Sequence, residues 1–346
     1  MRFGILGRVA AGLALAAATF GPAPAFAQQQ VNLEAAFDRA LGTDVRAPQD
    51  FTARYDSSLA RQIAQIADGS RGRIGVAAID LATGEEVAVL GDQRFPMAST
   101  SKIAIAATFL EGVDQGRWSL SSEYPLLVPV PSKRFSSAVA PVRPGQYMSA
   151  LTLIDRMITR SDNTATDALL AVVGGPAAVN DWARRAGLRE FTLTRDIATL
   201  VRDDGEIDPA VQIDLRDSAT PREMVRLLAG IHQGQWLSNS SRRVIIDAME
   251  RCRTGTRRIP AMLPGGVTVA HKTGSLNNTS SDIGIITTPD GRTIALAIYV
   301  TGQGTRLNRE GRIATIARAI YDGYGESARN YANARYGSST SAVAAN

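Results

Sequence analysis

Cysteine and histidine are almost absent from this chain of 346 residues. Cys252 is its only cysteine, so no internal disulfide can form, even in an oxidising compartment. His232 and His271 are its only histidines, which excludes a metal site built from several histidines and argues against a Ser-His-Asp triad. We therefore expect no metal and no cofactor, and we interpret Cys252 as a small side chain that packs beside a helix.

The chain also lacks dense basic runs and apolar runs long enough to span a membrane. Its formal net charge is only +5, so nucleic acid is not an expected partner. A short apolar run, residues 9–20, follows the basic Arg2 and Arg8, and Ala25-Phe26-Ala27 fits the small-x-small cleavage rule. Residues 1–27 are therefore predicted to be a cleaved signal peptide, with Gln28 as the new N-terminus. We expect a periplasmic or secreted protein without stable membrane insertion.

Hydrophobic patterning predicts strands at both ends of the mature chain and helices between them. Strands are predicted at residues 74–80, 86–90, 267–272, 281–287 and 293–301. Helices are predicted at residues 103–112, 151–159, 164–173, 176–186, 220–230, 240–251 and 311–321. Strands from such distant segments imply one antiparallel sheet flanked by helices, an α/β (α+β) fold with an inserted all-α domain.

These patterns divide the chain into consecutive parts. The signal peptide is followed by a linker and N-terminal segment, residues 28–50, and by one large domain, residues 51–325. In that domain the α/β part covers about 51–95 and 255–325, and the all-α part covers about 96–254. The small, polar tail, residues 326–346, is expected to be disordered.

Three short motifs stand in one order along the chain: Ser99-Thr100-Ser101-Lys102, Ser161-Asp162-Asn163 and Lys272-Thr273-Gly274. Because helix positions i and i+3 share a face, Ser99 lies beside the Lys102 amine at the start of a predicted helix. A lysine with a depressed pKa can act as a base there, and the helix N-terminus favours developing negative charge. Alone, the first motif also fits a serine N-cap and a solvated lysine. The second also fits a turn and an N-cap, a role that we assign to Asp162.

Together, in this order and at this wide spacing, the motifs resemble the active-site set of the penicillin-recognising serine enzymes. Ser-Asp-Asn is typical of the class A β-lactamases among them. The resemblance implies an α/β domain and an all-α domain with the active site in the cleft between. It implies that Ser99 is the nucleophile, that Lys102 activates it and that Ser161 passes a proton to the leaving nitrogen. It also implies an oxyanion hole formed by the backbone N–H groups of Ser99 and Ser275.

The same resemblance assigns residues that bind the substrate. Asn163 is expected to hydrogen-bond a side-chain amide of the substrate. Lys272 and Thr273, on a strand edge, suit a carboxylate, and Gly274 lets the substrate backbone come close. Arg258 matches a second carboxylate-binding arginine of some class A members, and the alternative is a solvated surface arginine.

One part of the chain departs from the family pattern. Class A β-lactamases carry a glutamate within Glu-x-x-Leu-Asn that orients the deacylating water, and this sequence has no such string. Counting forward from Ser-Asp-Asn leads to Ile197, whereas counting back from Arg216-Asp217 leads to Asp204, so this loop is about seven residues longer than usual. Asp204 and Glu206 are candidate replacements, and the alternative is that they belong to a solvated loop surface.

The sequence therefore predicts a periplasmic serine β-lactamase that opens small-molecule β-lactams through an acyl-enzyme on Ser99. The alternative is a penicillin-binding peptidase or esterase, acting on peptidoglycan-like substrates, that acylates but deacylates slowly. A non-catalytic binding module is disfavoured because every residue needed for acylation is present. We expect a monomer.

Overall fold

The computed structural model of the protein describes residues 45–46, 57–69 and 71–340. These residues lie in one compact unit, Thr43–Asn346. The predicted signal peptide and nearly all of the predicted linker lie outside the described residues. Within the described part, no helix is both long enough and apolar enough to cross a membrane.

The centre of the fold is a five-stranded antiparallel sheet assembled from the two ends of the unit. Its strand order is β10-β11-β12-β2-β3. The strands are β2 (Ile74–Asp80), β3 (Glu86–Val89), β10 (Thr268–Leu276), β11 (Thr279–Thr287) and β12 (Thr293–Thr301). This arrangement confirms the predicted antiparallel sheet and makes β10, which carries Lys272, Thr273 and Gly274, an edge strand of it.

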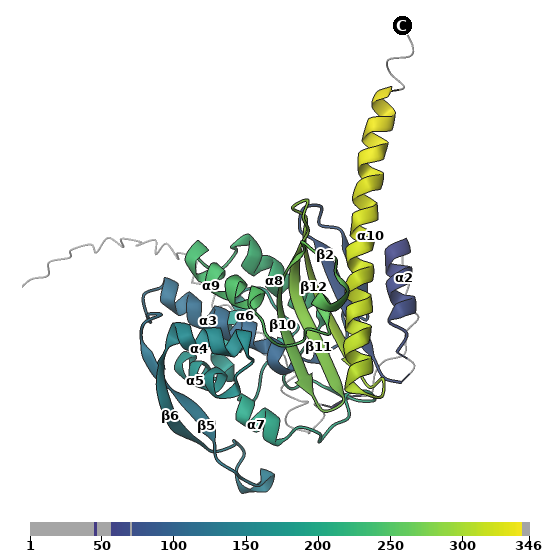
Figure 1. Ribbon diagram of the computed structural model, residues 1–346. Helices are drawn as coiled ribbons and strands as arrows, with labels where there is room; N and C mark the ends of the chain where they lie inside the picture. Colours follow the sequence, from purple (N-terminus) through teal and green to yellow (C-terminus); the bar gives the residue numbers. More distant parts are fainter. Residues whose placement is uncertain (1–44, 47–56, 70, 341–346) are drawn as a thin grey trace, which may run out of the picture. The chain divides into compact units, whose positions relative to one another are not determined.

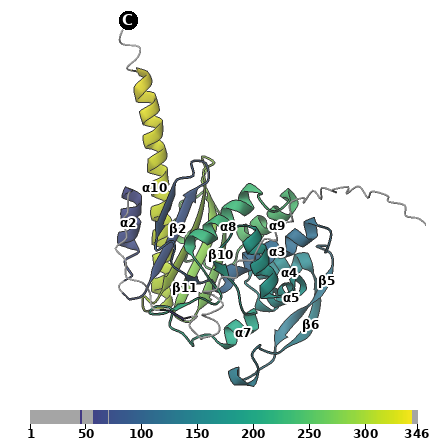
Figure 2. The same cartoon turned by 180° about the vertical axis from the view of Figure 1, so that it is seen from behind.

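Helices cover both faces of this sheet, because successive side chains of its strands alternate between two cores. Ala295, Ala297 and Tyr299 of β12 pack in one core with α8 (Pro221–Gln233) and the inserted helices. Ile294, Leu296 and Ile298 of the same strand pack in the other core with α2 (Ser58–Ile66) and α10 (Arg306–Thr340). Figure 1 shows α2 and α10 on one side of the sheet and α8 on the other, and Figure 2 shows the same layers from behind.

The inserted part is built around α3 (Lys102–Asp114), whose residues are buried on nearly all sides. A helix that is apolar all round belongs in a core, and α3 is surrounded by others. These are α4 (Ala150–Thr159), α5 (Asn163–Val173), α6 (Pro176–Arg185) and α9 (Asn239–Glu250). Lys102 is the first residue of α3, so its amine lies at the N-terminal end of the central helix of this part.

The remaining elements are short. They are β1 (Val45–Arg46), β4 (Phe95–Pro96), η1 (Ala98–Ser101), η2 (Arg134–Ser136), β7 (Phe191–Thr192), α7 (Ile197–Arg202), β8 (Ile213–Asp214), β9 (Ser218–Ala219) and η3 (Ile259–Met262). β4 pairs with β9, which also pairs with β7. This small sheet ties the segment before Ser99 to the end of the long loop at Asp217.

The inserted part and the C-terminal helix differ from the sequence-based expectation. The inserted part also contains a hairpin, β5 (Glu123–Pro129) with β6 (Val142–Ser149), whose half-exposed strands pair only with each other within the described residues. Its prolines and weak alternation hide it from periodicity analysis. The last helix, α10, does not end near residue 321 but continues to Thr340, so the backbone over residues 326–340 is helical where disorder was expected. Alanine and arginine recur in that segment, and both favour helix.

Candidate active site

Ser99 lies on a sharp turn at the entrance to α3. The preceding Ala98 has a φ of +49°, a left-handed conformation that is rare without glycine. Thr100 Oγ1 donates to the Met97 carbonyl at 2.7 Å, and Ser101 Oγ donates to the Ala98 carbonyl at 2.9 Å. Both neighbouring hydroxyls are thus bound to the backbone. Ser99 is half-buried, and its Oγ has no hydrogen-bond partner among the residues that the structure describes, which leaves it available as a nucleophile.

The Lys102 amine is fully buried and contacts two residues of the second motif, Ser161 and Asn163. Its Nζ donates to Asn163 Oδ1 at 2.7 Å, to the Ser161 carbonyl at 2.8 Å and to Ser161 Oγ at 3.2 Å. Burial and, secondly, the charge of Lys272 lower the pKa of Lys102 well below its usual range, against a smaller opposing effect of Asp167. A buried amine with a depressed pKa is suited to take up a proton.

Ser161 connects the two lysines. It has a φ of +58°, held between the end of α4 and Asp162, which caps α5 by accepting from Thr164 N at 2.9 Å and Ala165 N at 3.1 Å. The predicted capping role of Asp162 is therefore confirmed. Ser161 Oγ accepts from Lys102 Nζ and, at 3.0 Å, from Lys272 Nζ. With its lone pairs used by two amines, the Ser161 O–H is left to donate its proton to a third group.

Lys272 on β10 is the second buried cation of this cluster. Its Nζ also donates to the Thr273 carbonyl at 2.8 Å, and none of the side chain is exposed. Burial lowers the pKa of Lys272 to about 8. The cluster thus holds two lysine amines around one hydroxyl, and the one that stays charged at neutral pH, Lys272, attracts negatively charged groups.

Gly274 brings β10 against the turn that carries Ser99. A Cβ at this position would lie 2.7 Å from the Met97 carbonyl oxygen and 3.1 Å from Ala98 Cβ, so only glycine permits the observed approach. The residues that follow the two touching segments are Ser99 and Ser275, the predicted oxyanion-hole donors. Ser275 is exposed, whereas Gly274 before it is buried.

Arg258 is not a surface residue. Only 1% of it is exposed, so the alternative of a solvated arginine is wrong. Its guanidinium donates to the carbonyls of Gly274 at 2.8 Å and Ser281 at 2.7 Å, and to Ser275 Oγ at 2.7 Å. It also pairs with Glu310 at 3.2 Å. In this structure Arg258 therefore supports β10 from within, and it reaches the substrate edge through Ser275.

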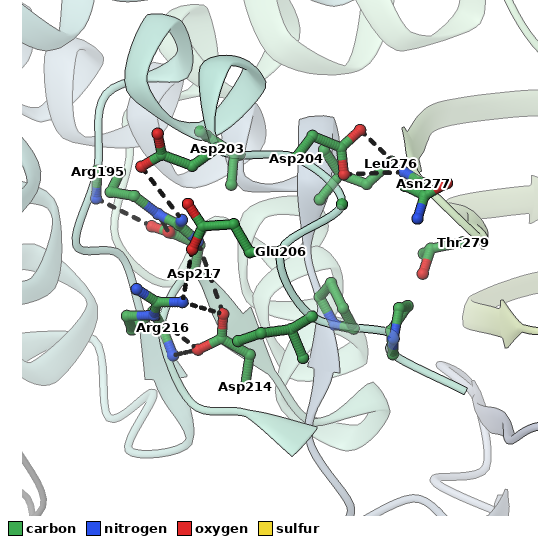
Figure 3. Close-up of a pocket in the computed structure, with 15 residues that line it drawn as sticks. Arg195, Asp203, Asp204, Glu206, Asp214, Arg216, Asp217, Leu276, Asn277 and Thr279 are labelled. Atoms are coloured by element: carbon green, nitrogen blue, oxygen red, sulfur yellow. Dashed lines mark hydrogen bonds and ion pairs between the residues drawn. The ribbon is translucent and has the colours of Figure 1, made fainter. Parts of the chain in front are cut away.

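Asp204 and Glu206, the candidate deacylation acids, lie together in a pocket formed by the long loop (Figure 3). Both Asp204 carboxylate oxygens accept from Asn277 N at 2.9 Å, at the β10–β11 turn. Glu206 pairs with Arg134 at 2.5 Å and with Arg216 at 3.8 Å. The lining of this pocket includes none of the residues of the three motifs. Both acids are thus bound to residues outside the three motifs.

The base of this loop is fixed by an ion pair that sequence analysis missed. Arg195 Nε lies 2.6 Å from Asp217 Oδ2, and Asp217 also accepts from Thr194 N at 2.7 Å (Figure 3). The Asp217 carbonyl accepts from Met97 N at 2.9 Å, so the same residue supports the turn before Ser99. An arginine and an aspartate separated by 22 residues carry no local signal of such a pair.

Asp167 is a second residue that sequence analysis missed. It is 3% exposed and lies one helical turn after Asn163 on α5. Its two oxygens accept from Ile197 N at 2.7 Å and Ala198 N at 2.9 Å, which anchors the first turn of α7. Burial raises the pKa of Asp167 to about 6, against the lowering effect of these bonds. The signal available in the sequence was one acid inside an otherwise apolar helix.

Several known proteins are similar to this chain in sequence. The family model described as the β-lactamase enzyme family matches residues 58–324. The extended-spectrum β-lactamase PER-1 of Pseudomonas aeruginosa is 28% identical over 283 residues, covering 78% of this chain and 88% of that protein. β-Lactamase CTX-M-8 of Citrobacter amalonaticus is 32% identical over 270 residues, covering 76% of this chain and 88% of that protein.

Solved structures show the same likeness over the folded unit. The class A β-lactamase described as the last common ancestor of Gram-negative bacteria has a TM-score of 0.66 and 34% identity, covering 78% of this chain and all of that one. A β-lactamase from Chitinophaga pinensis has a TM-score of 0.68 and 28% identity, with coverage of 78% and 100%.

Proposed function

This chain belongs to the class A β-lactamase family, and from that premise we propose that it opens β-lactam rings through an acyl-enzyme on Ser99. The observation that carries the proposal is the shared contact at Ser161 Oγ, where Lys102 and Lys272 meet from distant segments of the chain. Burying two amines beside one hydroxyl costs free energy of folding. A hydroxyl held in this way is suited to transfer a proton at a defined point.

Acylation follows from the positions of these groups. Ser99 Oγ attacks the lactam carbonyl carbon while neutral Lys102 takes the serine proton. The N–H groups of Ser99 and Ser275 hold the resulting oxyanion. As the carbon–nitrogen bond breaks, Ser161 gives its proton to the nitrogen and recovers one from Lys102 across their 3.2 Å contact. The lysine that accepted the proton thus returns it, and the charges balance.

Substrate binding involves the edge of β10. In this proposal the ammonium of Lys272 and the hydroxyl of Thr273 bind a carboxylate of the substrate. The Asn163 amide, whose Oδ1 accepts from Lys102 at 2.7 Å, binds a side-chain amide. Small anionic lactams fit this set of donors. The proposal includes export, because residues 1–27 have the pattern of a signal peptide.

The second candidate function is a penicillin-binding peptidase or esterase that acylates and then stalls. It is favoured by one observation: Asp204, bound to Asn277, and Glu206, paired with Arg134, line a pocket that includes no residue of the three motifs. Without a group that orients a water at the ester, the acyl-enzyme persists after it has formed.

Intact-protein mass spectrometry after mixing with a penicillin tests the first step. The wild-type protein should gain the mass of one penicillin, and Ser99→Ala should gain none. Ser101→Ala is the matched control, since it removes a hydroxyl of the same turn that is bound to the Ala98 carbonyl. Labelling of Ser99→Ala would refute the assignment of the nucleophile.

Turnover of a chromogenic cephalosporin then separates the two functions. Steady hydrolysis with a short-lived adduct indicates a β-lactamase. One equivalent of product followed by an adduct that persists for minutes indicates the peptidase or esterase.

A further inference from the structure

The pocket under the long loop holds a buried polar group without a partner. Thr279, the first residue of β11, lines this pocket and is only 1% exposed. Its Oγ1 has no hydrogen-bond partner among the residues that the structure describes. A hydroxyl in this position costs free energy of folding, because it has left water and gained no bond in return. A group held in the pocket can supply the missing bond.

The lining of the same pocket carries an excess of negative charge. Four of its carboxylates pair with arginines: Asp203 with Arg202 at 2.8 Å, Glu206 with Arg134 at 2.5 Å, Asp214 with Arg216 at 3.0 Å and Asp217 with Arg195 at 2.6 Å. The remaining carboxylate, Asp204, accepts only from the neutral backbone N–H of Asn277 in the described part of the chain. Among the described residues, one negative charge is therefore left without a cationic partner, and a monovalent cation would balance it.

The unpaired carboxylate and the unpartnered hydroxyl lie at the same turn of the sheet. Both Asp204 oxygens lie 2.9 Å from Asn277 N, and Thr279 follows two residues later, paired with Leu276 of β10. Figure 3 shows Asp204 and Thr279 next to Asn277. Asp204 is exposed whereas Thr279 is buried, so the polar side of the pocket runs from an open carboxylate to an enclosed hydroxyl. Both groups have lone pairs that can accept hydrogen bonds from one donor.

The lining also contains apolar side chains, those of Pro96, Leu200, Ile207, Pro209 and Leu276. An inorganic cation gains nothing from apolar neighbours, whereas they remove the alkyl chain of an organic amine from water. The described residues also include no group of three or more acidic, histidine or cysteine side chains suited to a metal ion. The pocket therefore favours an organic cation that carries N–H donors.

We propose that this pocket is a binding site for a small primary alkylammonium ion. The ammonium group donates hydrogen bonds to the Asp204 carboxylate and to Thr279 Oγ1, and the alkyl chain packs against Leu276. The bound cation joins the long loop to the β10–β11 turn and so stabilises the loop against opening. None of these residues belongs to the three motifs, so the site is independent of β-lactam hydrolysis.

The test needs no β-lactam, so it stands even if the proposed function fails. The folded full-length protein is titrated with n-butylammonium chloride at constant ionic strength and followed by amide NMR spectra. The signals of Asn277 and Thr279 should shift together along one saturating curve. n-Butanol, which has the same alkyl chain and no charge, should bind about tenfold more weakly. Potassium chloride at the same concentrations should not shift these signals.

Two variants test the two polar groups. Asp204→Asn should lower the affinity for butylammonium by about tenfold, because it removes the charge from a charge-assisted hydrogen bond. Asp208→Asn is the matched control, since Asp208 is an exposed acid of the same loop that is bound to Asn278 at 2.8 Å and lies outside the lining. This control should keep the wild-type affinity. Thr279→Val should lower the affinity by about fivefold and should not lower the melting temperature of the ligand-free protein, because the lost hydroxyl had no partner.

Several outcomes would overturn the proposal. Equal losses of affinity in Asp204→Asn and Asp208→Asn would mean that the loop attracts cations only by its overall charge. Butanol that binds as tightly as butylammonium would make the pocket merely apolar, and equal shifts with potassium chloride would make it a site for inorganic cations. A ligand-free Thr279→Val protein that melts well below the wild type would mean that the hydroxyl is already satisfied in the free protein.

Discussion

The charge of Lys272 lowers the pKa of Lys102, and the variant Lys272→Met measures this effect. Methionine keeps the length of the side chain and removes its charge. The charge of Lys272 is one cause of the depressed pKa of Lys102, second to burial. Removing it should therefore raise the pKa of Lys102 and reduce the fraction of neutral amine that can take the serine proton.

The strength of the repulsion between the two charged amines follows from their separation. Lys102 Nζ and Lys272 Nζ lie 3.2 and 3.0 Å from Ser161 Oγ, so they are separated by at most the sum of these distances, about 6 Å. At an effective dielectric constant of about 20, two unit charges at about 6 Å repel by about 3 kcal/mol. The acidic limb of the acylation rate should therefore move to higher pH when the charge of Lys272 is removed.

The assay is the rate of acylation by a chromogenic cephalosporin between pH 5 and 10, under single-turnover conditions. A cephalosporin ester that lacks the carboxylate is measured in parallel. This substrate makes no carboxylate contact with Lys272, so its pH profile reports the change in Lys102 protonation alone. Lys272→Arg is the control because it keeps the charge and should keep the acidic limb in place. An acidic limb that stays at the wild-type pH in Lys272→Met would refute the role of Lys102 as the base. The wild-type profile should also fall above about pH 8, where Lys272 loses its proton.

Four further outcomes are expected. Ser99→Ala should lose all labelling by a penicillin while its melting temperature stays close to wild type; retained labelling contradicts the mechanism. Gly274→Ala should lower the free energy of unfolding by about 1–3 kcal/mol, because its Cβ would meet the Met97 carbonyl at 2.7 Å; an unchanged urea midpoint contradicts the close approach. Asp217→Asn should cost about 1–3 kcal/mol in the same measurement, since it weakens the pair with Arg195; equal stability would mean that the loop base is held otherwise. Asp204→Asn and Glu206→Gln should change the deacylation rate by less than about twofold, because both carboxylates are bound elsewhere; accumulation of acyl-enzyme in either variant would restore that residue as the base.

The sheet could be predicted from the sequence because alternation and apolar runs are local signals. Residues 74–80 and 293–301 were predicted as strands with the bounds that β2 and β12 have in the structure. β10 was predicted to end at residue 272, but it continues to Leu276. The prediction ended too early because the segment Lys272-Thr273-Gly274-Ser275 is polar and shows no apolar alternation. The pairs Gly274–Ser281 and Ser275–Ser280 continue the strand pairing through small and polar residues, a composition that periodicity analysis assigns to a loop.

The site was less accessible to sequence reasoning, since its contacts join segments far apart in the chain. No local pattern predicts that Lys102 and Lys272 share the hydroxyl of Ser161; only the resemblance implied that the motifs meet. Arg258 shows the limit of a residue-by-residue comparison. An arginine at a matching position is here turned inward to the carbonyls of Gly274 and Ser281, which no sequence feature distinguishes from a solvated side chain.

The long loop changes which groups can serve the second half of the reaction. Where counting forward predicts the water-orienting glutamate, the chain has Ile197, whose N–H is bound to Asp167 and whose side chain cannot accept a proton. Once Ser99 is acylated, however, its oxygen carries no proton, and Lys102 is again free to take one after Ser161 has delivered the first to the leaving nitrogen. A water that reaches the ester from the side of Lys102 can then use the same base as the serine did. If the proposed reaction proceeds in this way, both of its steps depend on the neutral fraction of Lys102, and the pH limb moved by Lys272→Met should move for deacylation as well as for acylation.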